Sequence, residues 1–431
     1  MNLLSSLSGV SENFISFMVK QLGAIDLNWI GDIIRTLIEG IGITAVGVIV
    51  FTLILKTIVL PLDIFSKVKT KKQSLIMERM RPQMEKLQKQ YADDKNMYNQ
   101  KVMELYKKNG YSMLGICLPT VVSLVIFMIV FSQFSTYSQY ANLELYRGMV
   151  DAYNGEAAKY VCVDEDAPYD KNDNAGFLFE RQDSDGETVY LVDFDRFESY
   201  YTDNRDTAAG EPSYDAYIQK YVSGEEITEN DMFMAVKDYM AEFSRQAAAD
   251  YYHLNKQKFL WVGNIWYPDS LLNREVPSFD KFVSSLSRAS DLANYEESYE
   301  EVTYNLQTEK DTYNGYFVLI IVAIGMMFLS QFFTMRMQKS MNDLGTVDGS
   351  GKRTNKIMLI AMPIIYGLFS FFYSAAFSLY MITNTTYSFI TTLIINKSLD
   401  VKFKKLEERQ ELEKYLRKPS KGQKNSAAKK R

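Results

Sequence analysis

Lys56 is a cation inside an otherwise uncharged apolar segment, residues 41–62. About 20 apolar residues form a helix that crosses a bilayer, and this segment has that length. An ionisable group in such a helix is costly in contact with lipid, so it usually faces protein or water and indicates a functional site. Two other interpretations stay open. Lys56 can extend its side chain to the nearby membrane surface at Leu62, or it can lie uncharged beside the hydroxyl groups of Thr52 and Thr57.

Residues typical of covalent catalysis are scarce in this chain. It has one histidine, His253, and two cysteines, Cys117 and Cys162, which fall in different predicted regions and are not expected to bond to each other. P-loop, GxSxG and HExxH patterns do not occur in the sequence. The acidic segment 164–173 does not have the spacing of a calcium-binding loop. We therefore expect no enzyme activity, no metal site and no cofactor.

The apolar runs predict five membrane-spanning helices. The uncharged run 357–396 is too long for one span, because its 40 residues would extend about 60 Å as a helix, so we divide it at Ser374-Ala375-Ala376. The expected organisation is an extracellular N-terminal tail (1–41), span 1 (42–62), a cytoplasmic helical hairpin (63–113), span 2 (114–135), an extracellular domain (136–314), span 3 (315–335), a cytoplasmic loop (336–356), span 4 (357–373), span 5 (377–396) and a basic cytoplasmic tail (397–431).

The distribution of charge gives this organisation a direction. Residues 63–136 carry 12 basic and 6 acidic side chains and residues 357–431 carry 13 and 5, whereas residues 137–314 carry 15 and 36. Lysine and arginine close to the ends of spans mark the cytoplasmic side. We therefore expect a multi-pass protein of the cell membrane, with its N-terminus outside and its C-terminus in the cytoplasm.

The segments between the spans have patterns of their own. Residues 29–37 predict an amphipathic helix, which either lies in the outer membrane interface or packs on the extracellular domain. In that domain, residues 177–181 and 188–192 predict a β-hairpin, and residues 231–260 and 282–306 predict helices. The overall prediction is an all-α polytopic membrane protein with an inserted α+β extracellular domain.

The cytoplasmic hairpin carries methionines at helical spacing, and these are candidate contacts for a flexible apolar substrate. Met77, Met80 and Met84 lie on one face of its first helix, and Pro82 is expected to kink or restart that helix. The alternative is that they pack only against the second helix. Three further polar residues, Ser123, Gln331 and Asn384, are candidates to line a groove beside Lys56, or else to form hydrogen bonds between helices.

Several motifs resemble the YidC-type (Oxa-type) membrane protein insertases. Residues 53–62, with Lys56 where that family usually has arginine, resemble its first span, and Met80-Arg-Pro-Gln-Met-Glu-Lys-Leu87 resembles its hairpin. Further resemblances lie at residues 105–119, 259–269, 362–363 and 379–384. Together they cover about 27–135 and 256–400. Lysine at 56, Met381 in place of a common tryptophan and the large domain at 137–314 indicate a divergent, Gram-positive-like branch.

The resemblance implies a membrane protein insertase and chaperone that is not an enzyme. Its groove would be hydrophilic, positively charged, open to cytoplasm and lipid, and lined by Lys56, Ser123, Gln331, Met381 and Asn384. It would act on nascent or newly made membrane proteins in the lipid bilayer, alone or with the Sec translocon, with the basic tail as a ribosome contact and without DNA. The alternative is a transporter or channel with an extracellular regulatory domain, which should have internal repeats; none is visible in the sequence.

Overall fold

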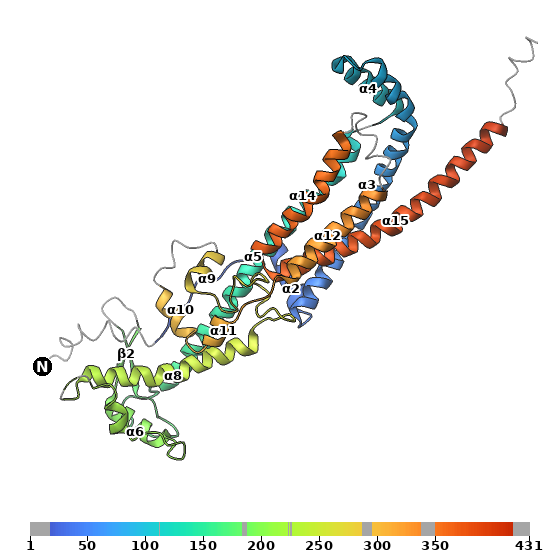
Figure 1. The fold of residues 1–431 in the computed structure, drawn as a ribbon. Coiled ribbons are helices and arrows are strands. Elements are labelled where there is room, and N and C mark those ends of the chain that lie inside the picture. Colours follow the sequence, from blue (N-terminus) through green and yellow to red (C-terminus); the bar gives the residue numbers. More distant parts are fainter. Residues whose placement is uncertain are drawn as a thin grey trace, which may run out of the picture. The chain divides into compact units, whose positions relative to one another are not determined.

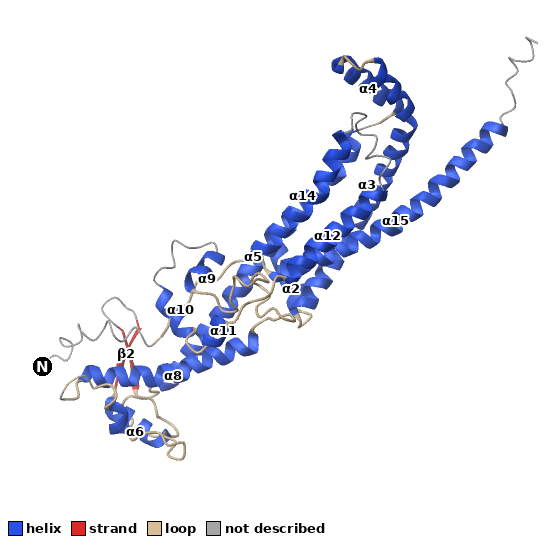
Figure 2. Ribbon diagram, viewed as in Figure 1, coloured by secondary structure: helices blue, strands red, loops and turns tan. Residues whose placement is uncertain are grey.

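The computed structural model describes residues 18–111, 113–182, 188–222, 224, 226–286, 295–337 and 350–416. The chain divides into two compact units. The helical unit comprises residues 29–135 and 317–431, and the inserted unit comprises residues 1–28 and 136–316. The described residues are mostly helical, as predicted (Figure 2).

The helical unit is built from long helices that run alongside one another (Figure 1). They are α2 (Trp29–Glu39), α3 (Thr44–Gln90), α4 (Lys95–Asn109), the first part of α5 (Met113–Ala157), α12 (Val318–Met337), α14 (Ser350–Phe372) and α15 (Ala375–Leu416). Helix α12 packs against both α14 and α15, and α15 also packs along α3. This arrangement places the apolar segments of distant parts of the chain against one another.

Two helices of the described residues are long and apolar enough to cross a membrane. They are α3, through its apolar N-terminal part, and residues 318–336 of α12. Residues 359–372 of α14 form a shorter apolar helix. The remaining predicted spans therefore stay predictions.

Helix α3 continues through both of its prolines. The sequence predicts a kink or a restart at Pro82, and the restart was wrong, because a single helix runs from Thr44 to Gln90 with Pro61 and Pro82 inside it. Proline removes one backbone hydrogen bond from a helix, which neighbouring turns can tolerate. The first span and the first helix of the hairpin are thus one continuous element.

Capping residues account for both ends of α4 and for the start of α15. The carboxylate of Asp94 accepts hydrogen bonds from Asn96 N and Met97 N at the start of α4, and Gly110 ends that helix in the left-handed conformation at φ 69°. Ser374 lies between α14 and α15 and accepts a hydrogen bond from Phe377 N at 3.3 Å. The break in the long apolar run lies at residues 373–374, next to the predicted position.

The amphipathic helix α2 uses part of its apolar surface against protein. Ile34 and Ile38 are buried, and an added Cβ at Gly47 of α3 would lie only 2.7 Å from Ile38 Cα. Glycine at this position therefore allows α2 and α3 to touch. Trp29 and Ile33 remain exposed on the same helix, at 72% and 48%.

The inserted unit contains the predicted β-hairpin and several shorter helices. Strands β1 (Leu178–Gln182) and β2 (Thr188–Val192) pair antiparallel, with Leu178 opposite Val192. The helices are the second part of α5, a short 3₁₀ turn (Ala158–Tyr160), α6 (Phe194–Asn204), α7 (Tyr214–Ile218), α8 (Glu229–Asn255), α9 (Phe279–Ser285), α10 (Glu296–Val302) and α11 (Gln307–Asp311). The single helix predicted over 282–306 was wrong, because in the described residues α9 ends at Ser285 and α10, which begins at Glu296, ends at Val302.

Two hydrophobic cores hold the inserted unit together. The first joins α5, the end of α8 and residues 276–286 and 299–306, and Tyr146, Tyr252 and Tyr299 are buried in it. The second joins the hairpin, α6, α7 and the start of α8, with Phe177 and Phe197 fully buried among tyrosines. Helix α8 contributes to both cores and thereby connects them.

A charged cluster connects α5, α8 and α10. Arg245 binds Glu301 through two hydrogen bonds of 2.8 Å, and the hydroxyl of Tyr153 donates to the same carboxylate at 2.9 Å. Burial, together with the Glu301 charge, raises the pKa of Tyr153, so that its hydroxyl remains a donor at physiological pH. The cluster should therefore stabilise the first core.

We expect Glu301→Ala to lower the free energy of unfolding by about 2 kcal/mol, because it leaves Arg245 and Tyr153 partly buried without their acceptor. Differential scanning fluorimetry of the full chain in detergent should record a decrease in melting temperature of about 4–8 °C. Glu300→Ala is the matched control. The Glu300 carboxylate is exposed, so the loss of its ion pair with Lys310 should cost little. Equal effects of the two variants would contradict the role of the cluster.

Candidate functional site

A cavity of about 470 Å³ lies among the helices of the helical unit and includes Lys56 in its wall. Eleven of its sixteen lining residues have polar or charged side chains, although much of its surface is apolar. The polar members are Lys56, Asp63, Lys67, Ser330, Thr334, Tyr366, Tyr380, Asn384, Thr385, Ser388 and Thr392, and the apolar members are Leu55, Val59, Ile126, Phe127 and Met327. We call this cavity the groove.

The charges of the groove come from one face of α3. Lys56, Asp63 and Lys67 are separated by seven and four residues, and a helix turns 100° per residue, so these side chains share a face and span about 16 Å. Asp63 lies four residues before Lys67, which is the favourable order for an acid and a base. The three groups together carry a net charge of +1 when all are ionised.

The opposite wall of the groove is a row of polar residues on α15. Tyr380, Asn384, Ser388 and Thr392 follow one another at intervals of four residues and therefore lie on one face. The hydroxyl of Thr392 donates to Ser388 O at 2.5 Å, within its own helix. A hydroxyl bonded in this way keeps oxygen lone pairs that can accept from another group.

The two walls are fastened to each other at one end of the groove. Lys67 Nζ donates to Thr392 Oγ1 at 2.7 Å. One turn further along α3, Lys71 forms an ion pair with Asp400 of α15. Lys56, by contrast, has no hydrogen-bond or ion-pair partner among the residues that the structure describes. The two lysines thus differ: Lys67 holds α15, whereas the charge of Lys56 is available to a molecule in the groove.

The structure brings two of the five predicted groove residues together. Lys56 and Asn384 line the groove. Met381 is fully buried and Gln331 is partly buried on α12, and neither belongs to the lining; the Gln331 side-chain oxygen has no hydrogen-bond partner among the described residues. Ser123 lies on α5, but its side chain is outside the described part of the chain. The role of these residues stays a prediction.

Sequence reasoning missed Asp63 and Lys67, although a signal for them exists. The apolar run ends at Leu62, so the span was expected to end there. Counting helical turns from Lys56 past Pro61 would have placed both charges on its face. The hydroxyl groups of α15 had no comparable signal, because serine and threonine occur on several faces of that helix. On α12, Ser330 and Thr334 lie four residues apart on one face, which is a signal that the sequence analysis did not use.

The methionines of the cytoplasmic hairpin are packed inside it. Met77, Met80 and Met84 are 1–2% exposed and form a core with Val102 of α4. Packing within the hairpin accounts for all three side chains in this conformation. Contact with a substrate would require α3 and α4 to separate.

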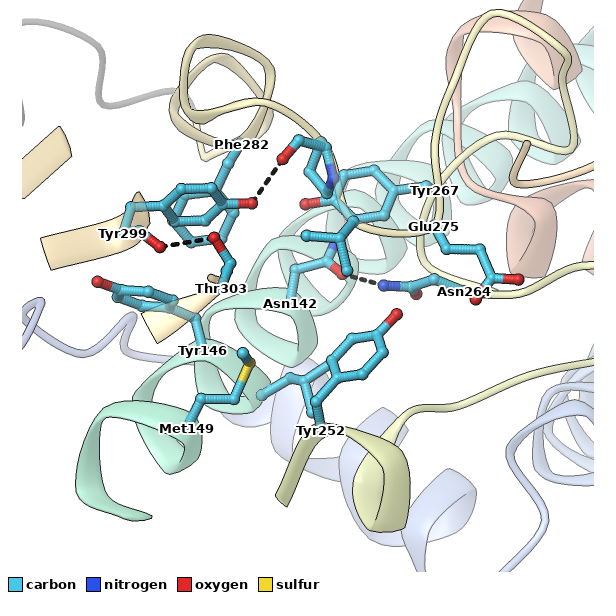
Figure 3. Close-up of a pocket in the computed structure, with 13 residues that line it drawn as sticks. Asn142, Tyr146, Met149, Tyr252, Asn264, Tyr267, Glu275, Phe282, Tyr299 and Thr303 are labelled. Atoms are coloured by element: carbon cyan, nitrogen blue, oxygen red, sulfur yellow. Dashed lines mark hydrogen bonds between the residues drawn. The ribbon is translucent and has the colours of Figure 1, made fainter. Parts of the chain in front are cut away.

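A second cavity lies in the first core of the inserted unit (Figure 3). It has a volume of about 30 Å³, enough for one or two water molecules and too small for an organic ligand. Its wall includes Asn142 and Asn264, which are hydrogen-bonded to each other at 3.2 Å. Among the described residues, no group of three metal-ligating side chains is present. The groove is therefore the better candidate site.

Comparison with known proteins identifies the family of the chain. The model of the family described as "60Kd inner membrane protein" matches residues 36–158 and 232–404. This match reaches further into the inserted unit than the sequence motifs indicate. It leaves out residues 159–231, which contain the β-hairpin, α6 and α7. No solved structure matches the chain.

Relatives named "Membrane protein insertase YidC" match parts of the chain. The protein of Fusobacterium nucleatum is 34% identical over 119 residues, which is 28% of this chain and 53% of that protein. The proteins of Citrifermentans bemidjiense (33% over 110 residues) and Leptospira interrogans (35% over 89 residues) match over 24% and 21% of this chain and 20% and 14% of their own lengths. The chain thus matches about half, or less, of these relatives. With the family model matched over more than half of its residues, the chain belongs to the 60Kd inner membrane protein family of YidC-type membrane insertases.

Proposed function

We propose that this chain inserts membrane proteins and helps them fold, and that the groove receives the polar part of the substrate. The observation that carries the proposal is a cavity of about 470 Å³ lined by a row of hydroxyl groups and by Lys56, which has no hydrogen-bond or ion-pair partner among the described residues. Two of the helices that form this cavity, α3 and α12, are long and apolar enough to cross a membrane. The membership of the family supports the same activity. The proposal includes five spans, an N-terminus outside and a C-terminus in the cytoplasm.

The physical task is to lower the cost of moving polar residues through about 30 Å of hydrocarbon. A polar cavity replaces part of the water that such residues lose, and the Lys56 charge attracts acidic side chains in an N-terminal tail. The apolar part of the substrate can then leave sideways along the exposed apolar surfaces of the helices. This route needs no covalent step, nucleotide or cofactor.

The hairpin would act before the groove. Because Met77, Met80 and Met84 are buried against α4, their contact with a substrate requires the hairpin to open. Methionine side chains adapt to many apolar shapes, which suits transient contact with varied sequences. The Sec translocon is a further proposed partner, and the groove would serve equally with or without it.

Site-specific crosslinking tests the proposal directly. A photoreactive amino acid at Val59 or Ser388, which line the groove, should crosslink to a nascent single-span substrate with an acidic N-terminal tail. The matched control is Ile58, the neighbour of Val59, which is 71% exposed and not part of the lining. Equal crosslinking from positions 58 and 59, or none from 59 and 388, would overturn the groove as the substrate path.

Lys67 should contribute to insertion through its contact with α15. We expect Lys67→Met to reduce the yield of an acidic-tailed substrate about threefold in reconstituted vesicles, because it removes one groove cation and the hydrogen bond to Thr392. Lys71→Met is the control, since it removes the adjacent, more exposed ion pair with Asp400 and leaves the groove charge unchanged. A loss with Lys71→Met as large as that with Lys67→Met would speak against the groove charge.

The basic C-terminal tail is proposed to contact the ribosome. Residues 419–431 contain Lys421, Lys424 and a final Lys-Lys-Arg, and such clusters bind anionic surfaces in a salt-dependent manner. Removing residues 419–431 should reduce co-sedimentation with ribosomes several-fold at low salt, and less at high salt. Unchanged co-sedimentation at low salt would leave the tail without this role.

A further inference from the structure

Two turns of the inserted unit end in exposed leucines. In the first, Phe259 and Val262 exchange backbone hydrogen bonds of 2.8 and 2.9 Å, and Leu260 at the tip is 72% exposed. In the second, Asn273 N donates to Ser270 O at 3.3 Å, and the tip residues Leu271 and Leu272 are 40% and 62% exposed. We call residues 259–262 and 270–273 the leucine turns.

The fixed geometry of the first turn argues against a chance exposure. Leu260 has a φ of 52°, a left-handed conformation that costs free energy for a residue other than glycine. The turn thus holds a large apolar side chain outward at a position where glycine or asparagine would fit with less strain. A single exposed leucine needs no explanation, but three on two adjacent turns do.

A buried asparagine fastens both turns to the same segment. Asn314 is fully buried; its side chain accepts from Asn264 N at 2.7 Å and donates to Asn264 O and Pro268 O at 3.0 and 2.9 Å. Its backbone N–H donates to Asn273 O at 2.9 Å. Asn314 therefore binds the last residue of the second turn and the chain that directly follows the first turn.

The same segment leads directly into an apolar helix. Tyr316 N donates to Asp269 Oδ1 at 2.7 Å, and an added Cβ at Gly315 would overlap Asp269. Residues 315–316 therefore lie against the loop of residues 259–273 that contains both leucine turns. Phe317 follows, and α12 begins at Val318. Residues 318–336 are long and apolar enough to cross a membrane. The turns are thus tied to the last residues before a span.

The side chains around these residues fit a membrane interface. Tyr313 and Tyr316 are 43% and 54% exposed, and Arg274 lies 4.2 Å from the centre of the Tyr313 ring. Tyrosine concentrates where hydrocarbon meets head groups, and a nearby cation can bind lipid phosphate. Lys258, next to the first turn, is also exposed.

We propose that the leucine turns insert into the outer head-group region of the bilayer and anchor the inserted unit to the lipid surface. Continuity with α12 identifies lipid as the occupant, since Asn314, four residues before α12, is hydrogen-bonded to Asn273 of the second turn and to Asn264, two residues after the first. The inference requires only that α12 spans the bilayer with the inserted unit outside. It does not depend on insertase activity or on the groove.

Fluorescence of a label at each turn tests the proposal. In the full chain carrying Cys117→Ser and Cys162→Ser, a nitrobenzoxadiazole label is attached to Leu260→Cys or Leu272→Cys. The protein is reconstituted in vesicles of phosphatidylethanolamine and phosphatidylglycerol. The matched control is Val163→Cys, an apolar residue that is 86% exposed and lies beyond the family match.

We expect blue-shifted emission at positions 260 and 272, quenching by lipids with a spin label near the head group, and at least threefold weaker quenching by iodide than at position 163. Equal quenching by iodide at all three positions would mean that the turns lie in water and would overturn the proposal. Protection from iodide without quenching by spin-labelled lipid would indicate a protein partner, such as a second copy of the chain, and would overturn it equally.

Discussion

Lys56→Glu should reduce insertion of a single-span substrate with an acidic N-terminal tail at least tenfold. The substitution changes the net charge of the three ionised groove residues from +1 to −1, because Asp63 and Lys67 remain. Two unit charges 6 Å apart interact by about 3 kcal/mol at an effective dielectric constant of 20. Replacing attraction by repulsion of this size exceeds the 1.4 kcal/mol that corresponds to a factor of ten.

The measurement is complementation in a host depleted of its own insertase, with protease protection of the substrate tail as the readout. Lys56→Arg should retain most activity, because it keeps the charge at the same position on α3. Lys69→Glu is the matched control. It makes the same charge change on the same helix, but Lys69 is exposed, lies 5.2 Å from the centre of the Phe65 ring and does not line the groove.

Three outcomes of this experiment are informative. Full activity of Lys56→Glu would refute the charged groove and favour the interpretation that Lys56 only extends to the membrane surface. Equal losses with Lys69→Glu would indicate an effect of overall charge on orientation. Loss for acidic tails but not for neutral tails would assign the Lys56 charge to substrate recognition.

Asn314→Ala should be the most destabilising single substitution in the segment that leads to α12. It removes three side-chain hydrogen bonds from a fully buried site and leaves Asn264 N, Asn264 O and Pro268 O without that partner. Each unsatisfied buried group costs about 1–3 kcal/mol, so we expect a loss of about 4 kcal/mol and a decrease in melting temperature of about 10 °C.

Tryptophan fluorescence during thermal unfolding in detergent can follow this change. Of the three tryptophans in the chain, Trp261 and Trp266 belong to the loop that Asn314 holds. Asn305→Ala is the control, because Asn305 is exposed and makes one long hydrogen bond of 3.4 Å to Gln246. An unchanged melting temperature in Asn314→Ala would show that the loop is held by other contacts. The same variant should also weaken the anchoring of the leucine turns.

Much of the organisation follows from local chemistry and was therefore predictable. Apolar runs of membrane length and an isolated lysine are visible in the sequence because each depends on neighbouring residues. The β-hairpin was predicted from alternation on either side of a polar turn, and it is present with Leu178 opposite Val192. The family was identified from motifs in a fixed order, and the family model confirms it.

The groove itself needed the tertiary structure. Asp63 and Lys67 share the face of Lys56 only because α3 continues past Pro61, and a proline in a sequence does not reveal whether its helix continues. Which hydroxyl groups of α15 meet that face depends on the rotation of one helix against another. Met381 shows the same limit, because its burial results from packing that the sequence does not specify.

The sequence by itself determined the class of protein, the position of a cation in an apolar helix and the family. The first two features are set by composition and by spacing along one helix, so neighbouring residues suffice to define them. The family follows from the order of several short motifs along the chain, which the sequence also contains. Only the tertiary structure decided that Lys67 binds Thr392, 325 residues away, and that Asn314 holds Asn264 across 50 residues. Such contacts are chosen by the packing of whole elements, and no local pattern in the chain encodes which side chains will meet.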